Sequence, residues 1–258
     1  LALIDIQKSA EFLQSLLRAR GFLFSAASIP PQDITDGVVS IDVLIPKFDE
    51  TPFEIRAVGG KGGVAGADDF VSNVESLVST HIQAGQPIQR RNIEHALLVL
   101  NELPGISATS EFTEGASEGT SRLMIDILTE KSKEFLVARN NHGSVTTGKF
   151  INEYSGSWSN YFARNERINA RVDSGDGTSL RSIQVSYPLI SEGYFIDSSL
   201  SRLDYEGGSA ALGNAIEGSA KTASLGVRVP LVRSLEESQT VTATLNGQWS
   251  EDFANSVL

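Results

Sequence analysis

The sequence predicts α+β domains in which strands and helices follow the order β-α-α-β-β, followed by the N-terminal part of a transmembrane antiparallel β-barrel. Two observations predict this fold class. Apolar residues recur at helical spacing only in the first half of the 258-residue chain, whereas apolar and polar residues alternate through the second half. Strands with one apolar and one polar face produce such alternation. We therefore expect the helices and the long strands to lie in different domains.

Three stretches of the first half carry apolar residues spaced three and four apart, which places them on one face of a helix. These residues are Phe12, Leu13, Leu16 and Leu17, then Phe70, Val74, Leu77 and Val78, and finally Ile93, Ala96, Leu97 and Leu100. We expect helices that end near residue 20 and that span residues 67–81 and 87–103. Pro87 suits the first turn of the last helix, because proline has no N–H to leave unpaired there.

A compact unit is expected over residues 50–131. A strand over residues 53–58 precedes the two helices, and strands over residues 106–113 and 122–130 follow them. This gives the order β-α-α-β-β. We expect both helices to pack on one face of a three-stranded sheet, with Leu97 in the core and no parallel pair among the strands.

The second half is expected to contain seven strands. They span residues 134–141, 147–157, 165–173, 180–189, 193–205, 219–231 and 239–250. Strands of about ten residues with Ser, Thr, Asn and Gly on one face are typical of a transmembrane β-barrel with a polar lumen. In the last strand we expect Val241, Ala243, Leu245 and Trp249 to face lipid. A soluble β-sandwich is the alternative, although its strands are usually shorter, at about 5–6 residues.

Charge and composition exclude several classes of function. The formal net charge of −11 repels phosphate and argues against binding to nucleic acid. Cysteine is absent, so disulfides and thiolate chemistry are excluded. The longest apolar run is Ala96–Leu100, whereas a transmembrane helix needs roughly 20 apolar residues. The chain has no leader-like opening and starts and stops abruptly, so we expect it to be a fragment of a longer protein.

The residues that could form a chemical site are scattered. The run Gly60-Lys61-Gly62-Gly63-Val64-Ala65 imitates a dinucleotide fingerprint, but a second helix follows it instead of a parallel strand, so we interpret it as a turn. His81, His95 and His142 lie in three different elements, and Asp173 and Asp176 suit a hairpin tip. We expect no catalytic residue, no cofactor, no metal and no small-molecule substrate, and the protein is not expected to be an enzyme.

Several motifs resemble those of one transporter family. Ile29-Pro30-Pro31-Gln32-Asp33-Ile34 with Gly37 and a strand over residues 38–45 resembles part of the family's first polypeptide-transport-associated (POTRA) domain. Ala96–Ile106 is similar to the second helix of the next POTRA domain, with its Leu-Pro-Gly stop. Asn140–Ser144 with Thr147-Gly148 resembles the first barrel hairpin, and Ser186–Leu189 with Gly193 a later strand and turn. The family comprises the outer-membrane transporters of two-partner secretion, which include haemolysin secretion/activation and filamentous-haemagglutinin secretion proteins.

The resemblance implies a domain division and a mechanism. Residues 1–48 would be the C-terminal part of a first POTRA domain, residues 50–131 a second POTRA domain, and residues 132–258 the first strands of an incomplete outer-membrane β-barrel. The protein would lie in a Gram-negative outer membrane with its POTRA domains in the periplasm. Its partners would be the membrane lipid and a secreted exoprotein, which arrives unfolded and is recognised through an amino-terminal secretion domain. The exoprotein would then thread through the barrel.

The edge of the second POTRA sheet is the candidate binding element. We expect the strand over residues 106–113 to lie at this edge, beside the first helix, and to capture cargo by strand addition. Its residues on one face are Ile106, Ala108, Ser110 and Phe112, and the alternative is that these are ordinary core residues. Two other functions stay open, an assembly factor of the same superfamily and a soluble β-rich surface adhesin.

Overall fold

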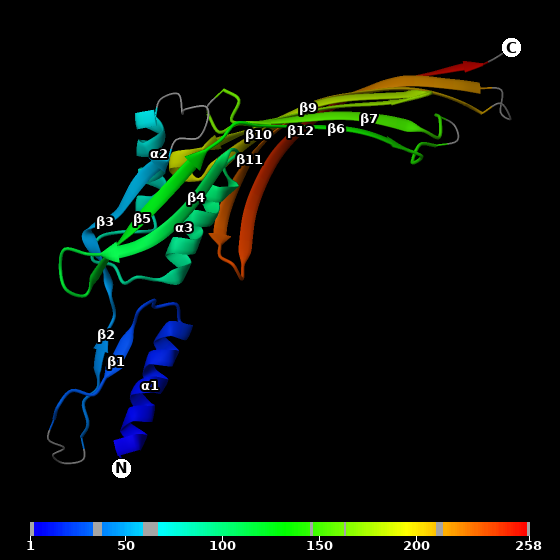
Figure 1. The fold of residues 1–258 in the computed structure, drawn as a ribbon. Coiled ribbons are helices and arrows are strands. Elements are labelled where there is room, and N and C mark those ends of the chain that lie inside the picture. The colour runs from blue at the N-terminus through cyan, green and yellow to red at the C-terminus, as the bar shows by residue number, and fades with distance from the viewer. Residues whose placement is uncertain are drawn as a thin grey trace.

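The computed structural model describes residues 3–32, 38–58, 67–144, 147–162, 164–209 and 214–256. The molecule is elongated (Figure 1), with a helix at its N-terminal end, a unit of helices and strands in the middle, and a long curved sheet that runs to the C-terminus. The fold class changes where the sequence predicts the change. The last strand of the middle unit ends at Thr129, and the first strand of the long sheet begins at Ser132.

The N-terminal part consists of helix α1 (Leu3–Ala19) and two short antiparallel strands, β1 (Ala26–Ser28) and β2 (Asp42–Leu44). The strand expected over residues 38–45 is therefore shorter than predicted. The side-chain amide of Gln32 explains this difference, because it bonds both the N–H of Ser40 at 2.7 Å and the C=O of Ser40 at 2.8 Å. Residues 33–37 of the Pro-Pro-Gln-Asp segment lie outside the described residues.

The predicted apolar face of α1 is only partly correct. Phe12 and Leu16 are exposed, whereas Ile6 and Ala10 are buried. The three-residue strands β1 and β2 cover a narrow strip of the helix, so only part of its apolar surface is in contact with them. No helix in the described ranges is both long enough and apolar enough to cross a membrane.

The middle unit has the predicted order β-α-α-β-β. It contains β3 (Lys47–Val58), α2 (Ala67–Ser79), α3 (Arg90–Glu102), β4 (Ile106–Glu114) and β5 (Thr120–Thr129). Burial alternates along β5, so that Leu123, Ile125 and Ile127 are fully buried. They share one core with the apolar faces of α2 and α3. The Gly60–Ala65 run between β3 and α2 lies outside the described residues.

The expectation of no parallel pair in this sheet is wrong. The strand order is β3-β5-β4, in which β3 pairs parallel with β5 and β4 pairs antiparallel with β5. The two-helix connection returns the chain to the end of the sheet where β3 finished, so β4 runs back against β3. The hairpin then turns β5 into the direction of β3, and β5 takes the central position between the two.

The second half forms one sheet of seven strands in which every strand is antiparallel to the next along the chain. The strands are β6 (Ser132–Asn140), β7 (Ile151–Ser159), β8 (Arg167–Gly175), β9 (Thr178–Leu189), β10 (Tyr194–Ser209), β11 (Asn214–Arg233) and β12 (Ser238–Ser256). The sheet is a single curved layer (Figure 1). This up-and-down order is that of a partial β-barrel.

The two faces of the long sheet differ in chemistry. Leu245 is 79% exposed, and Val241 and Trp249 on the same face are also exposed. Thr242 and Thr244 point to the opposite face, where they line a cavity with residues of the middle unit. Within the described residues, no second sheet covers the apolar face, as a sandwich would require. The arrangement supports the barrel and not the adhesin alternative.

We predict that Leu100→Ala destabilises the middle unit more than Leu97→Ala does. Leu100 is fully buried, whereas Leu97 is only partly buried against the same core. Truncation of a buried leucine costs about 2–5 kcal/mol because a cavity remains. Urea denaturation of the intact protein, followed by the helical circular dichroism signal, measures both variants. Equal losses in the two variants would contradict this packing.

We predict that Leu245→Arg impairs folding into lipid, whereas Thr244→Arg at the neighbouring position is tolerated. Arginine on the lipid face of a barrel costs roughly 2–4 kcal/mol near the bilayer midplane, but arginine in a polar lumen keeps its water. The measurement is the free energy of unfolding of the full-length protein in phospholipid vesicles. A similar loss in both variants would show that the two faces do not differ as described.

Candidate binding edge and adjoining cavity

Strand β4 forms one edge of the sheet in the middle unit, as the sequence predicts. The four candidate residues differ in their surroundings along this strand. Ile106 and Ala108 are buried, Phe112 is partly buried with its ring 4.9 Å from that of Phe24, and Ser110 is exposed. The side chains of Ile106 and Ala108 therefore serve the core. What the edge offers to a partner is its backbone.

The side chain of Asn101 shows which backbone groups of β4 point outward. Its Oδ1 accepts a hydrogen bond from the N–H of Ala108 at 2.9 Å, and its Nδ2 donates to the C=O of Ala108 at 2.9 Å. Ala108 thus turns its backbone away from β5. Because this direction alternates along an antiparallel strand, Ser110 and Phe112 also point outward, and Thr109 points toward β5.

Asn101 occupies the edge at one end and leaves the rest open. No other strand in the described part of the chain pairs with the outer margin of β4. We name residues 110–114 the open edge, since their outward groups face neither β5 nor Asn101. Sequence reasoning missed Asn101. The only signal was a polar residue in the last turn of a helix that directly precedes an edge strand.

The open edge lies beside the second helix of the unit and not beside the first, as the sequence reasoning expected. Helix α3 leads straight into β4 through Pro104 and Gly105. Gly105 has φ +73, and a Cβ at this position would lie 2.3 Å from the carbonyl oxygen of Glu130. Only glycine fits this turn, which sets β4 against the helix it follows.

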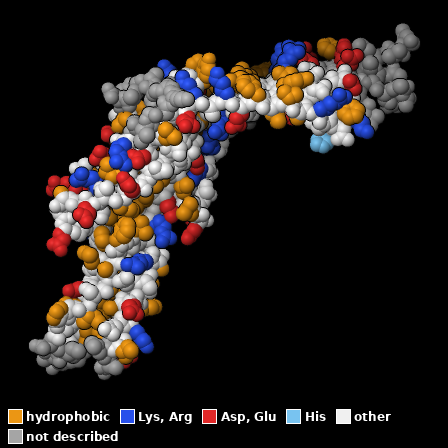
Figure 2. Space-filling model, viewed as in Figure 1, with side chains coloured by type: hydrophobic (Ala, Val, Ile, Leu, Met, Phe, Trp, Pro, Cys, Tyr) orange, Lys and Arg blue, Asp and Glu red, His pale blue; other side chains and the backbone are white. Residues whose placement is uncertain are grey.

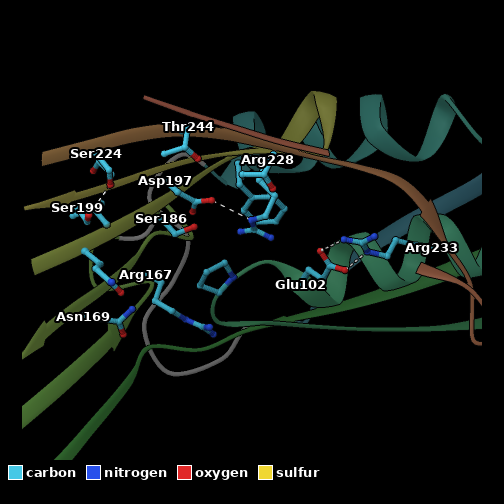
Figure 3. Close-up of a pocket in the computed structure, with 17 residues that line it drawn as sticks. Glu102, Arg167, Asn169, Ser186, Asp197, Ser199, Ser224, Arg228, Arg233 and Thr244 are labelled. Atoms are coloured by element: carbon cyan, nitrogen blue, oxygen red, sulfur yellow. Dashed lines mark hydrogen bonds and ion pairs between the residues drawn. The ribbon is translucent and has the colours of Figure 1, made fainter. Parts of the chain in front are cut away.

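Strand β4 starts next to a cavity of about 640 Å³ (Figure 3). The cavity lies between the end of α3 and the polar face of the long sheet. Its lining is dominated by polar side chains from β8 to β12, including Arg167, Asn169, Gln184, Asp197, Ser199, Ser224, Arg228, Thr242 and Thr244. Glu102 and Pro104 line it from the middle unit. We name this cavity the mouth.

Two of the three arginines that line the mouth, Arg228 and Arg233, form ion pairs. Arg228 Nε donates to Asp197 Oδ2 at 3.1 Å, and its guanidinium lies 4.0 Å from the ring centroid of Phe195. The hydroxyls of Ser199 and Ser224 are 2.6 Å apart (Figure 3). Phe195 is only 1% exposed and belongs to the core of the middle unit although it lies on β10. The wall is therefore polar, its aromatic ring is covered, and Arg167 is the lining arginine for which the described residues show no ion pair.

Arg233 fastens the mouth to the middle unit. It forms an ion pair with Glu102 of α3, and it also donates to the C=O of Gln239 at 2.9 Å and to the hydroxyl of Thr240 at 2.7 Å. Arg233 is only 8% exposed. A buried cation needs such partners, because its desolvation is costly otherwise. The sequence offered no signal for this residue beyond an arginine next to a turn.

Two further turns of the long sheet touch the middle unit. Gly193 has φ +68, and a Cβ there would lie 3.1 Å from Leu77 and 3.3 Å from Val99. Asn165 Nδ2 donates to the C=O of Pro104 at 3.3 Å. Together with Arg233 and Phe195, these contacts form what we name the junction. They hold the start of β4 in a fixed position at the mouth.

The structure brings together two of the three histidines that the sequence left scattered. The rings of His81 and His95 are 4.1 Å apart, whereas His142 is exposed in the hairpin between β6 and β7. Burial, followed by the charges of His81 and Arg233, lowers the pKa of His95 to about 4, although Glu102 acts in the opposite direction. Burial also lowers the pKa of His81. No group of three or more potential metal ligands occurs among the described residues.

We predict that the folded protein loses stability as the pH falls from about 6.5 toward 4. The pKa of His95 is lower in the folded state than its ordinary value of 6.5, so the unfolded chain binds more protons in this window. The contribution of His95 to stability is fully present above its unfolded-state pKa of 6.5 and is lost as the pH falls toward the folded-state pKa of about 4. The melting temperature of His95→Gln should depend less on pH in this window, and His142→Gln is the control. A profile unchanged by His95→Gln would contradict the assignment.

Comparisons with known proteins agree with the motifs and the fold. Residues 1–45 match the family described as POTRA domain, ShlB-type. The heme/hemopexin transporter protein HuxB of Haemophilus influenzae is 24% identical over 193 residues, which cover 75% of this chain and 32% of HuxB. HuxB of strain 86-028NP is 23% identical over the same share of each chain. The chain thus spans about a third of the length of these relatives.

Solved structures share the fold. CdiB from Escherichia coli has a TM-score of 0.67 at 20% identity, and CdiB from Acinetobacter baumannii has 0.63 at 18%. Each match covers 98% of this chain and 46% of the other. BamA from Haemophilus ducreyi lacking POTRA domains 1-3 has a TM-score of 0.52 at 14% identity, over 100% of this chain and 46% of BamA. The ShlB-type POTRA match, the HuxB relatives and the CdiB-like fold together support the resemblance to two-partner secretion transporters that the sequence motifs indicate.

Proposed function

We propose that this chain is the POTRA and pore-entry part of an outer-membrane transporter that captures a secreted partner protein and passes it through the barrel. The chain lies in the outer membrane with its POTRA region in the periplasm. Residues 1–48 act as the C-terminal part of a first POTRA domain, residues 50–131 act as a second POTRA domain, and residues 132–258 form the first strands of the barrel. The transporter HuxB is a relative, and only its role in transport is carried over to this chain.

The observation that carries the proposal is the course of β4. Its open edge lies at residues 110–114, and its first residue, Ile106, is two residues beyond Pro104, which lines the mouth. An extended segment that adds a strand to β4 runs along a line that ends at the mouth. Backbone hydrogen bonds supply the affinity in strand addition, so cargo of many sequences can bind. An unfolded exoprotein, recognised through its amino-terminal secretion domain, is the partner that suits this edge.

The polar face of the long sheet supplies the next part of the route. Hydroxyl and amide side chains line the mouth, and Arg228 is paired with Asp197. Arg171 on the same face is paired with Glu153 at 3.3 Å and with Asp173 at 2.8 Å. Arg167 is the one arginine of the mouth for which the described residues show no ion pair, so most of the charge along this face is compensated within the protein. Capture and passage make and break no covalent bond, so the proposal includes no catalytic residue and no cofactor.

The two other functions receive less support. An assembly factor of the same superfamily is represented by BamA, whose TM-score of 0.52 is lower than the 0.67 of CdiB from Escherichia coli. A soluble adhesin would cover the apolar face of the long sheet, yet Leu200, Leu225 and Leu245 on that face are all more than half exposed. No specific observation favours either function.

We predict that Ser110→Pro abolishes secretion and leaves the POTRA unit folded. Proline removes the outward N–H of Ser110, which an added strand needs and β5 does not. Thr109→Pro removes an inward N–H that bonds β5, so it should destabilise the sheet itself. Urea denaturation measures folding in both variants, and release of the partner protein into the medium measures secretion. Normal secretion by a folded Ser110→Pro variant would exclude this edge.

Site-specific crosslinking tests the contact directly. Photoreactive probes at positions 110, 112 and 114 should crosslink the amino-terminal domain of the partner, whereas a probe at the exposed position 54 on β3, the far edge of the sheet, should not. The side chain of Phe112 packs on Phe24, so the probe at position 112 also needs a folding control. Crosslinks confined to the first POTRA domain or to the barrel would locate capture elsewhere.

A further inference from the structure

The apolar face of the long sheet carries a row of three basic side chains on adjacent strands. Arg181 of β9 lies opposite Arg202 of β10, and Arg202 lies opposite Lys221 of β11. Lys221 is in turn opposite Trp249 of β12. All three basic residues are exposed. Neighbouring strands are about 4.8 Å apart, so the row brings three cationic groups within roughly 10 Å. We name it the basic row.

The basic row lies at the end of the apolar band that is farther from the POTRA region. On the same face, the rows closer to the junction contain Leu200, Leu225 and Leu245, and then Ile196 and Val227. Val229 and Lys221 are about 26 Å apart along β11 at roughly 3.3 Å per residue. A strand tilt of about 40° reduces this to about 20 Å of membrane depth, close to the apolar height of such barrels. The row therefore lies at the interface on the side opposite the periplasm.

The charges of the row are only partly balanced by protein groups. Like charges on directly opposed strand residues are destabilising. Asp204 pairs with Arg202 at 2.9 Å, but among the described residues no carboxylate forms an ion pair with Arg181 or Lys221. The next row outward carries Asp204 and Glu251. An anion bound by the basic row therefore lies on the side of the apolar band, away from these carboxylates.

We propose that the basic row binds the phosphate groups of a phosphorylated glycolipid in the outer leaflet of the membrane. Arginine donates paired hydrogen bonds to phosphate, and lysine adds a point charge. A lipid whose phosphate lies on Arg181 and Lys221 places its acyl chains along Leu200 and Leu225, which are exposed on the same face. Trp249 beside Lys221 is an aromatic residue at the level where barrels carry aromatic girdles. This inference rests on the outer-membrane location and not on the capture of cargo.

The test measures the melting temperature of the full-length protein in phosphatidylcholine vesicles with and without bis-phosphorylated lipid A. A ligand that binds only the folded state raises the melting temperature. The phosphorylated lipid should raise it for the unchanged protein, and Arg181→Gln/Lys221→Gln should lose most of that shift. Lys133→Gln/Arg139→Gln is the matched control. This variant also removes two positive charges from the apolar face of the sheet, but on β6, away from the basic row, so the lipid should still raise its melting temperature.

Three results would overturn the proposal. One is an equal shift in the Arg181→Gln/Lys221→Gln variant, and another is an equal shift with dephosphorylated lipid A, which would assign the effect to acyl chains. The third is an equal shift with phosphatidylglycerol, which would show attraction to any anionic lipid. Secretion of the partner is measured separately in each variant. The melting-temperature test of lipid binding therefore stays valid even if the proposed capture of cargo is wrong.

Discussion

The rest of the structure depends on the junction between the end of α3 and the turns of the long sheet. The ion pair of Glu102 with Arg233 joins residues that are far apart in sequence, and Arg233 also ties together the two strands of its own hairpin. Phe195 extends the core of the middle unit into the sheet. Apolar burial stabilises this contact, and the hydrogen bonds and the ion pair of the buried Arg233 fix how the β11–β12 turn lies against α3.

This contact determines how the two chemically different surfaces are placed. The polar face of the sheet turns toward the middle unit, where it lines the mouth with Glu102 and Pro104, and the apolar face turns outward. Figure 2 shows hydrophobic side chains, in orange, exposed along the long sheet on one side of the molecule. Because Pro104 follows the helix that carries Glu102, the first residue of β4 stays at the mouth. A single anchored helix end thus aligns the sheet edge, the cavity and the membrane-facing surface.

Local periodicity predicted most of the elements, and contacts distant in sequence explain what it missed. The helices over Phe70–Val78 and Ile93–Leu100, and the alternation from Val241 to Trp249, each follow from neighbours a few residues apart. The parallel pairing of β3 with β5 depends on how the two-helix connection returns the chain. The contact between the rings of His81 and His95 and the ion pair of Arg233 with Glu102 depend on tertiary packing. Asn101 was missed because its role is defined only by the strand beside it.

Asn101 has a consequence for how long a bound chain stays in place. It leaves the outward N–H and C=O groups of Ser110, Phe112 and Glu114 for an incoming strand, which gives six hydrogen bonds at most. At about 0.5–1.5 kcal/mol net for each bond, these bonds contribute roughly 3–9 kcal/mol before the entropic cost of association is subtracted, so binding at this edge is weak. In the proposed function, such weak binding gives a short dwell time, and the chain is released without an energy source. A chain that diffuses past it is slowed at the entrance and is not trapped there.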